Sequence, residues 1–474
     1  MDGSEGTPAA AGRATPSVRP APTAGRRVAA AGALVALLLA ITLAVVGFLD
    51  DPVRLLVAVV LVTVVAMAGW TALVNRGTPR VIAAVAAGAA LLGLVVLLLT
   101  GTPLRAAGLI GLVLVSTAAA RVALGHDMAT APAGMREVGP AAHGVLIMNR
   151  WSGGGKVERF GLEAAARAQG VTPIVLQRGD DLRELAERAI ADGADVIGMA
   201  GGDGSQALVA DVAHRRGIPF VCVPAGTRNH FALDLGLDRA DVAAALAAYG
   251  HAVERRVDLA LIGDRVFVNN ASLGVYATVV QSAAYRDAKM ATTAQVLPDL
   301  LGSGAAGFDL RYAGPDGQLA HPAHVVLVSN NVYRLDSLNG FGTRARTDAG
   351  VLGVVTVTVD RARDLPALIA AETSGHIERF RGYRAWTTPE FVIDSDDLLV
   401  DVGVDGEALQ LAPPLHFRSL PGALRVRTPV DAPGVAPAAA APRGIGPAVT
   451  ALVRVLAGRS PADGPAVPVP PAER

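Results

Sequence analysis

The chain has 474 residues, of which 51% are hydrophobic, and a mean hydropathy of +0.42, which is high for a wholly soluble protein. Its 42 basic residues balance its 42 acidic residues, so no overall charge argues for a nucleic-acid partner. The single cysteine, Cys222, excludes an internal disulfide framework and fits a domain in a reducing compartment.

The N-terminal part begins with an arm and continues with apolar windows. Residues 1–27 are rich in Ala, Pro, Gly and Arg, and we expect disorder there because few bulky apolar side chains are available for burial. The next three windows contain no charged residue, and each has about the ~20 residues needed to cross a bilayer. These windows are Val28–Phe48, Leu55–Val74 and Val81–Leu99.

A fourth apolar window, Ala106–Ala120, is shorter, but Arg105 and Arg121 at its ends could extend outward to the membrane surface. The sequence therefore predicts four transmembrane helices within residues 28–124. A signal peptide followed by buried core helices is the alternative. It is disfavoured because no small-residue cleavage site follows Phe48 and because the apolar windows recur.

The arginines between these windows predict the topology. Arg26 and Arg27 precede the first window, Arg76 and Arg80 lie between the second and third, and Arg121 follows the fourth. Since positive residues favour the cytoplasmic side, the arm and everything after Arg121 should be cytoplasmic. Four spans make this arrangement consistent and predict a multi-pass protein of the cell membrane, whereas three spans would place the C-terminal half outside.

From about residue 143 the pattern changes to alternating apolar strands and amphipathic helices. Such alternation predicts a parallel sheet with right-handed crossovers, which binds ligands beyond the carboxyl ends of its strands. The expected strands are 143–149, 172–177, 194–200 and 219–225, and the expected helices are 160–170, 181–193 and 205–216. Beyond about Arg256, strands dominate, at 257–263, 265–271, 324–330, 351–359 and 398–406.

Three polar, glycine-containing turns fall at the carboxyl ends of predicted strands. They are "NRWSGGGK" (149–156), "GGDGS" (201–205) and "PAGTRNHFA" (224–232). Glycine lets backbone N–H groups approach an anion closely, and a following helix adds the partial positive charge of its N-terminus. The combination suits phosphate. The first turn alone is weak evidence, because Val157 stands where a Walker A loop has Ser or Thr.

Taken together, "GGDGS" and "PAGTRNHFA" closely resemble the motifs of the diacylglycerol kinase catalytic domain, the lipid-kinase family that includes sphingosine and ceramide kinases and bacterial relatives. Later segments, "NNASLG" (269–274) and "VDGE" (404–407), match further motifs of the family in the correct order. Two positions depart from the usual patterns, since Arg150 replaces a proline and His230 replaces an acidic residue. The resemblance covers roughly residues 143–425.

The sequence thus predicts a multi-pass α-helical membrane region followed by a two-domain body. For that body the resemblance implies an α/β nucleotide-binding domain and a β-rich C-terminal domain, with the active site in the cleft between these two. The expected boundaries are a disordered arm at 1–27, four transmembrane helices at 28–124 and a linker at 125–142. The α/β domain then covers 143–255, the β-rich domain 256–427 and an Ala/Pro-rich tail 428–474. A short interfacial helix is expected at 446–459 within this tail.

The resemblance also implies the chemistry, which is transfer of the ATP γ-phosphoryl group to the hydroxyl of a diacylglycerol-like or related membrane lipid. Mg²⁺ would be held through the ATP phosphates, and Asp203 would orient its loop or reach the metal shell. Asp405 would accept the proton of the acceptor hydroxyl, although Asp-Gly is also a common hairpin turn. The implied nucleotide-binding residues are Asn149, Ser152, Gly153, Gly201, Gly202, Asp203, Gly204, Ser205, Thr227, Asn229 and Glu407.

Several alternatives stay open at this point. A kinase of a soluble substrate, similar to the NAD kinases, shares the GGDG turn, and a non-catalytic lipid or nucleotide sensor would also need these turns. The second, structural Mg²⁺ site of the family is doubtful, because "TDAGVLG" (347–353) offers Asp348 alone. The motifs do not identify the lipid acceptor or the oligomeric state.

Overall fold

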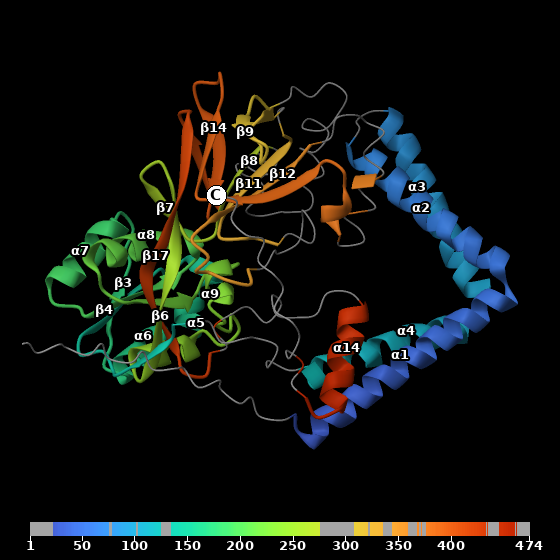
Figure 1. The fold of residues 1–474 in the computed structure, drawn as a ribbon, viewed down its shortest axis with the longest axis horizontal. Helices are drawn as coiled ribbons and strands as arrows, with labels where there is room; N and C mark the ends of the chain where they lie inside the picture. Colours follow the sequence, from blue (N-terminus) through green and yellow to red (C-terminus); the bar gives the residue numbers. More distant parts are fainter. Residues whose placement is uncertain are drawn as a thin grey trace, which may run out of the picture. The chain divides into compact units, whose positions relative to one another are not determined.

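The computed structural model of the protein describes residues 22–74, 78–100, 103–124, 134–274, 308–320, 323–334, 344–358, 367–368, 371, 376–432, 434, 445–459 and 461 (Figure 1). The chain separates into two compact units. The first unit contains the helices α1, α4 and α14, and the second contains α2, α3 and all the strands. Most of the predicted arm, part of the linker and most of the tail lie outside the described residues.

In the first unit, α1 (Ala24–Asp50) packs against α4 (Pro103–Leu124) and α14 (Ile445–Leu456). The hydroxyl of Ser116 on α4 donates to the carbonyl of Ala33 on α1 at 2.9 Å. Helix α1 begins four residues before the predicted apolar window, so Ala24–Arg27 are helical and do not belong to the arm.

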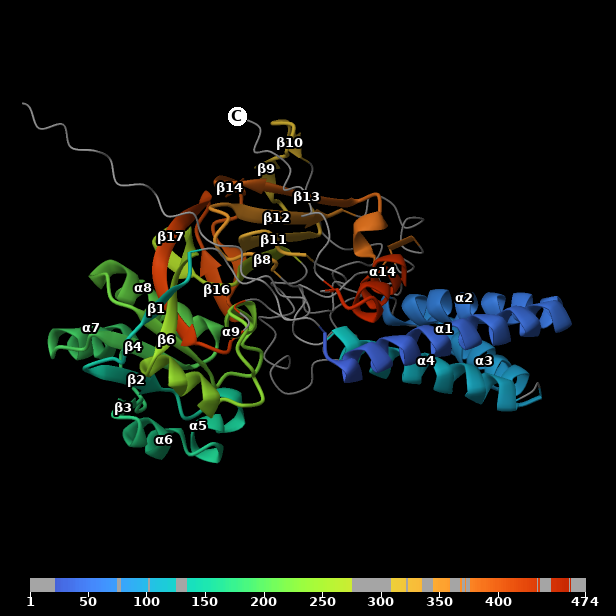
Figure 2. The same cartoon turned by 60° about the horizontal axis from the view of Figure 1, so that its bottom comes forward.

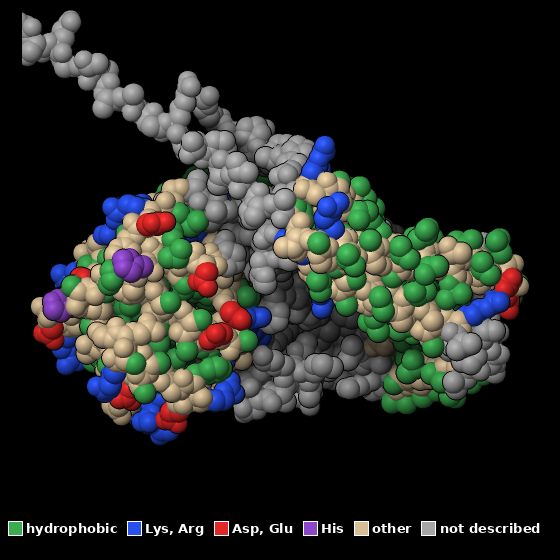
Figure 3. Space-filling model, turned by 90° about the horizontal axis from the view of Figure 1, so that it is seen from below, with side chains coloured by type: hydrophobic (Ala, Val, Ile, Leu, Met, Phe, Trp, Pro, Cys, Tyr) green, Lys and Arg blue, Asp and Glu red, His purple; other side chains and the backbone are tan. Residues whose placement is uncertain are grey.

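In the second unit, α2 (Pro52–Val74) packs along α3 (Thr78–Thr100). Large apolar side chains on α1–α4 are exposed, including Leu38, Leu92 and Leu114, and Figure 3 shows the outer surface of the helices covered with hydrophobic side chains. Among the described residues, two helices are long and apolar enough to cross a membrane, Ala24–Gly47 and Ala107–Leu124, while Leu56–Gly69 and Val81–Leu97 are shorter apolar helices.

The body of the protein, residues 134–434, begins with the predicted alternation of strands and helices. Its first elements are β1 (Arg136–Val138), β2 (Gly144–Met148), η1 (Ser152–Gly154), α5 (Lys156–Arg159), α6 (Leu162–Ala168), β3 (Thr172–Val175), α7 (Leu182–Ala191), β4 (Val196–Gly201), α8 (Asp203–Arg216), β5 (Phe220–Pro224), α9 (His230–Asp234) and η2 (Ala243–Tyr249). Helix α8 begins at Asp203, two residues before the predicted start, so Asp203 lies in the first turn of the helix.

Strands dominate the rest of the body, as the sequence indicates. They are β6 (Ala252–Ile262), β7 (Arg265–Phe267), β8 (Asn270–Gly274), β9 (Arg311–Ala313), β10 (Leu319–Ala320), β11 (Val325–Asn330), β12 (Leu352–Val357), β13 (Tyr383–Thr388), β14 (Glu390–Asp394), β15 (Val400–Val404), β16 (Glu407–Leu411) and β17 (Leu415–Pro429), with the short helix η5 (Ile377–Arg379) before β13.

These strands form two sheets. The first has eleven strands in the order β10-β9-β14-β17-β5-β4-β2-β3, and β6 adds to it by pairing with β17, β1 and β7. The strands β17, β5, β4, β2 and β3 are parallel neighbours, whereas the pairs β6–β17 and β14–β17 are antiparallel. The second sheet is antiparallel in the order β13-β12-β11-β8-β15-β16 (Figure 2).

The long strands β6 and β17 belong to both halves of the body. At one end β17 pairs in parallel with β5, and at the other end it pairs with β14, with a break in its pairing to β6 between Leu420 and Leu424. The first sheet therefore runs without interruption across the boundary that the sequence suggests at residues 255 and 256.

Three apolar cores fix this arrangement. One core lies against α7 and α8 and includes Met199 and Val209. A second lies on the other face of the parallel strands, where Leu162 of α6 and Leu246 of η2 pack. The third fills the space between the two sheets and contains residues such as Phe417 of β17. The carboxyl ends of β2, β4 and β5, and the hairpin between β15 and β16, are thereby held on rigid elements.

Candidate active site

The second and third glycine turns are joined through Asp203. Its two carboxylate oxygens accept hydrogen bonds from the backbone N–H groups of His230 (3.0 Å) and Phe231 (3.1 Å), the first residues of α9. Burial raises the pKa of Asp203 to about 6, while these two hydrogen bonds act in the opposite direction. Asp203 therefore links the second turn to the start of α9.

The third turn is closed by Asn229, which is buried and has a positive φ of 51°. Its amide oxygen accepts from the N–H of Gly226 at 2.8 Å, and its amide nitrogen donates to the carbonyls of Pro224 (3.0 Å) and Gly226 (2.8 Å). The side chain of Asn229 therefore shapes the third turn. The neighbouring Thr227 is exposed.

The first turn lies against the third. Asn149 donates its backbone N–H to the carbonyl of Ala200 at 2.9 Å, and its side-chain oxygen accepts from Trp151 at 3.0 Å. Ser152 begins η1, and Gly153, with φ of 57°, leaves no room for a Cβ against the carbonyls of Ala225 and Gly226. Glycine at this position permits the close approach of two backbone segments.

The second turn supplies a helix N-terminus. Gly201 ends β4, Gly202 precedes α8, and Asp203, Gly204 and Ser205 form its first turn. The first N–H groups of a helix have no acceptor within the helix, and they carry partial positive charge. This end of α8 is therefore suited to bind an anion such as a phosphate.

The hairpin between β15 and β16 brings two carboxylates close to the N-terminus of α8. A Cβ on Gly204 would overlap Oε1 of Glu407, so the Glu407 carboxylate lies directly against the first turn of α8. Glu407 also forms an ion pair with Arg265, the first residue of β7. The side chain of Glu407 is 44% exposed.

Asp405 occupies the tight turn of the same hairpin, where it and Gly406 both have positive φ (49° and 85°). Its carboxylate accepts three backbone hydrogen bonds, from Val268 (2.9 Å), Asn269 (2.9 Å) and Asn270 (3.1 Å). Burial, followed by the nearby charge of Asp203, raises the pKa of Asp405 to about 7. The "VDGE" motif is thus both a hairpin and part of the same electrostatic site.

Basic groups surround the third turn, and none of them is among the predicted site residues. Lys156 donates to the carbonyls of Pro224 and Arg239 at 3.4 Å each, and burial lowers its pKa. Burial, together with the charges of Arg344, Arg228 and Arg239, lowers the pKa of His230 to about 3. His230 is therefore neutral near pH 7, and these three arginines add positive charge that favours a polyphosphate ligand. Lys156 could have been found as the first cation after a glycine run, but Arg239 and Arg265 carry no local signal.

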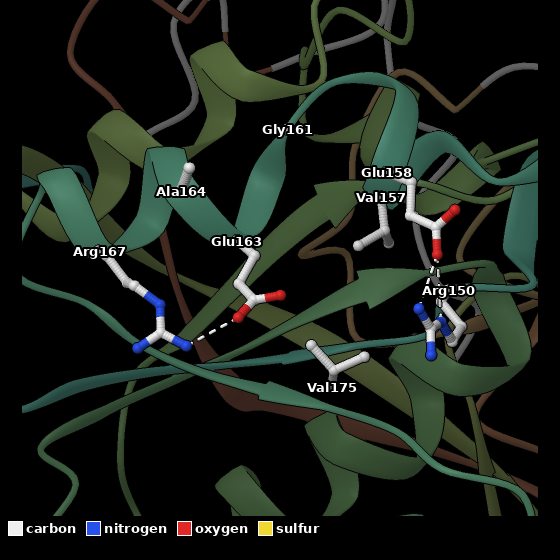
Figure 4. Close-up of a pocket in the computed structure, with 8 residues that line it drawn as sticks. All are labelled: Arg150, Val157, Glu158, Gly161, Glu163, Ala164, Arg167 and Val175. Atoms are coloured by element: carbon white, nitrogen blue, oxygen red, sulfur yellow. Dashed lines mark hydrogen bonds and ion pairs between the residues drawn. The ribbon is translucent and has the colours of Figure 1, made fainter.

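A surface cavity of about 330 Å³ lies beside the first turn, between α5, α6 and β3 (Figure 4). Two ion pairs line it, Arg150 with Glu158 at 2.8 Å and Arg167 with Glu163 at 2.7 Å. None of the residues of the second or third turn lines this cavity. Arg150, which departs from the family pattern, thus has a local partner in Glu158.

The described residues contain no group of three or more His, Cys, Asp or Glu side chains that could hold a metal ion. Both oxygens of Asp203 and both oxygens of Asp405 accept backbone hydrogen bonds, which leaves Glu407 as the most accessible carboxylate of the site. Asp348 pairs with Arg346 at 2.9 Å. This donor set fits Mg²⁺ that is bound mainly by the phosphates of a nucleotide.

The comparisons with known proteins agree with this geometry. The sequence model of the family described as "Diacylglycerol kinase catalytic domain" matches residues 143–262. A YegS-like protein of Pseudomonas aeruginosa, described as a probable lipid kinase, is 28% identical over 269 residues, which cover 53% of this chain and 83% of that protein. A diacylglycerol kinase of Mycobacterium tuberculosis is 32% identical over 122 residues, covering 25% of this chain and 40% of that protein.

The fold is also found among solved structures. A crystal structure of a candidate diacylglycerol kinase from Bacillus anthracis aligns with 62% of this chain and 98% of its own chain, with a TM-score of 0.50 and 18% sequence identity. The two-sheet architecture of the body is therefore shared with that protein.

Proposed function

Because this chain belongs to the family of the diacylglycerol kinase catalytic domain, we propose that it is a membrane-bound lipid kinase that transfers the γ-phosphoryl group of ATP to the hydroxyl of a diacylglycerol-like or related lipid. The observation that carries the proposal is the convergence of three glycine turns and the "VDGE" hairpin at the N-terminus of α8.

In this proposal the nucleotide phosphates bind at the first turn of α8 and beside the first and third turns. Backbone N–H groups around Gly202 and Gly204 face the phosphates, and Asn149, Ser152, Gly153, Gly201, Asp203, Ser205, Thr227 and Asn229 build or line the three turns. Lys156 and Arg239 add positive charge near the third turn. Mg²⁺ bound to ATP would neutralise part of the phosphate charge.

The two carboxylates of the hairpin divide the remaining roles. Glu407 is the more accessible carboxylate and lies at the N-terminal end of α8. We therefore assign to Glu407 the role of accepting the proton of the acceptor hydroxyl. Asp405 is held by three backbone N–H groups and positions the hairpin that carries Glu407. This differs from the sequence-based assignment of Asp405 as proton acceptor, and the variants below distinguish the two assignments.

The apolar helices α1–α4 support the proposed location at the membrane. Arg26, at the start of α1, donates to the carbonyls of Ala123 (2.9 Å) and Leu124 (2.7 Å), at the end of α4. Since α1 and α4 run in opposite directions, the N-terminal segment and the connection to the body leave on the same side of a membrane that both helices cross. Together with the arginine distribution, this supports a multi-pass protein of the cell membrane with a cytoplasmic kinase domain.

A lipid-phosphorylation assay tests the proposal. The purified protein in lipid nanodiscs is incubated with labelled ATP and Mg²⁺, and diacylglycerol, a sphingoid base, ceramide, a glycolipid and a polyprenol are compared with NAD⁺ as a soluble acceptor. We expect one lipid to be labelled. Labelling of NAD⁺ alone would indicate a kinase of a soluble substrate, and nucleotide binding without any transfer would indicate a sensor.

The same assay separates the two carboxylates. Glu407→Gln should lower turnover by about 10²-fold or more with little change in ATP-analogue affinity, because general-base catalysis typically contributes ~10² to 10⁴ in rate. Asp405→Asn should lower turnover less and also lower the melting temperature, since an amide cannot accept all three N–H groups. The reverse order, with Glu407→Gln close to wild type, would return the proton-acceptor role to Asp405.

A further inference from the structure

The C-terminal helix α14 packs on the N-terminal helices of the first unit. Leu452 and Val455 of α14 are buried together with Ala30 and Ala33 of α1 and Ala123 of α4. The small alanine side chains of α1 and α4 let α14 approach them closely. The segment predicted as a short interfacial helix in the tail is therefore packed against α1 and α4.

Two adjacent arginines at the start of α1 bind the ends of the other two helices. Arg26 donates to the last carbonyls of α4, at Ala123 and Leu124, and Arg27 donates to the carbonyl of Leu456 at 3.1 Å, at the end of α14. The last four carbonyls of a helix have no partner within the helix and carry partial negative charge. A cation is therefore favoured at each of these ends, and the two contacts hold α4 and α14 to the same end of α1.

The pattern of α14 matches this packing. Ala451, Leu452 and Val455 form one buried face, whereas Val453 is 49% exposed on the other side. The body ends at about residue 434, and α14 belongs to the same compact unit as α1 and α4. The body is thus connected to this unit at both of its ends, through residues 125–133 and through residues 435–444.

We propose that α14 is a C-terminal tether, a helix that binds the α1–α4 pair and joins the end of the kinase body to the membrane-embedded part of the same chain. Two covalent connections restrict the body more than one does, and this restriction favours reaction with a lipid that stays in the bilayer. The packing of α14 stands independently of the proposed lipid-kinase function, but its effect on turnover rests on that function.

A cleavage experiment tests the tether. A protease site is inserted between residues 438 and 439, and the full-length protein, with an affinity tag at each end, is purified in detergent and cut. Pull-down through the N-terminal tag should retain the C-terminal fragment. The double variant Leu452→Asp/Val455→Asp should retain at least tenfold less, because it places two carboxylates in an apolar contact. The matched control Val453→Asp, on the exposed face, should retain the C-terminal fragment as the cut wild type does.

Release of the wild-type fragment after cutting would overturn the proposal, and so would equal retention of the double variant and the control. A second measurement uses the uncut proteins. The double variant should phosphorylate a long-chain lipid in nanodiscs severalfold more slowly than the control, with equal rates on a short-chain lipid dispersed in detergent. Equal rates in nanodiscs would contradict the tether's role in turnover. Absence of all lipid phosphorylation in the wild type would contradict the proposed function, while the pull-down would still decide on the tether.

Discussion

Gly202 and Gly226 face each other where the second and third turns meet, but they differ in the space available for a side chain. A Cβ on Gly226 would overlap Cα of Gly202 and lie 2.6 Å from Oδ1 of Asn229, whereas a Cβ on Gly202 would find Gly226 Cα at 3.8 Å, an ordinary contact. The two backbones therefore touch, and only one of these glycines is required by packing.

We predict that Gly226→Ala separates the two turns and lowers both stability and phosphoryl transfer, with turnover reduced at least tenfold. Gly202→Ala is the matched control and should keep most of the melting temperature, since its φ of −87° suits any residue. Melting curves and lipid-phosphorylation rates of both variants check this. Equal losses of melting temperature and turnover in the two variants would show that activity does not depend on the close contact between the turns.

The raised pKa of Asp405 predicts a pH dependence of stability. Its folded-state pKa of about 7 exceeds its ordinary value of 3.8, so the folded protein holds a proton that the unfolded chain loses between these values. The stabilisation from this proton is present at low pH and is lost as the pH rises through 7. Between pH 5 and pH 8 the wild type should lose on the order of 1–3 kcal/mol relative to Asp405→Asn.

Urea unfolding of the two proteins in detergent at both pH values measures this difference. Asp397→Asn, an exposed aspartate on the loop before β15, serves as the control and should follow the wild type at both pH values. A constant offset between wild type and Asp405→Asn would show that Asp405 is ionised throughout this range.

The glycine turns are visible in the sequence, whereas the hydrogen-bond and ion-pair partners of their side chains are not. A carboxylate inside a glycine turn is visible in "GGDGS", but its acceptor role toward His230 and Phe231 depends on β4 and β5 being neighbours in the sheet. Asn229 was identified by its motif, yet its side chain serves the turn itself. Arg265 is far from Glu407 along the chain, so no local pattern could pair them.

At the scale of elements, α9 is held from two sides. Asp203 binds its first N–H groups, and Asp234 at its end forms a buried ion pair with Arg344 at 2.5 Å. Arg344 also donates to the carbonyls of Asn269 and Asn330, which belong to the β-rich half. Through Arg344, the third turn and the β-rich half of the body are fixed to each other.

We predict that Arg344→Ala destabilises the body by about 3–5 kcal/mol, because it leaves Asp234 buried without its cation. Arg346→Ala removes a partly exposed ion pair with Asp348 and should cost about 0–1 kcal/mol. Denaturant unfolding of both variants measures the difference. Similar small costs would show that Asp234 is protonated in the folded protein, in line with the upward shift of its pKa by burial.

The alternation of strands and helices was predictable because each element carries its own period of apolar residues, as in the helix Leu182–Ala191 and the buried strand Val196–Gly201. The role of β17 was not predictable. Nothing in its fifteen residues specifies that one end pairs with β5 and the other with β14. Those pairings are set by the packing of distant segments.

At the scale of the whole molecule, the four apolar helices and the arginine distribution predict the sidedness of the protein. A cysteine in place of Gln169, exposed on the body, should be protected from a membrane-impermeant maleimide in intact cells, whereas a cysteine in place of Asp51, between α1 and α2, should be labelled. The native Cys222 is buried and is replaced by Ala in both. Labelling of residue 169 from outside would reverse the proposed topology.

The long strand β17 also affects the synthesis of the protein. The ribosome makes the chain from its N-terminus, and a strand can pair only after its partner has emerged. β5 takes β17 as its parallel neighbour through Val426 and Arg427, although residues 225–414 separate the two strands. The nascent chain therefore carries an open edge on β5 while nearly the whole β-rich half is translated, and such edges pair readily with other chains. We expect this open edge to favour aggregation until β17 has been made.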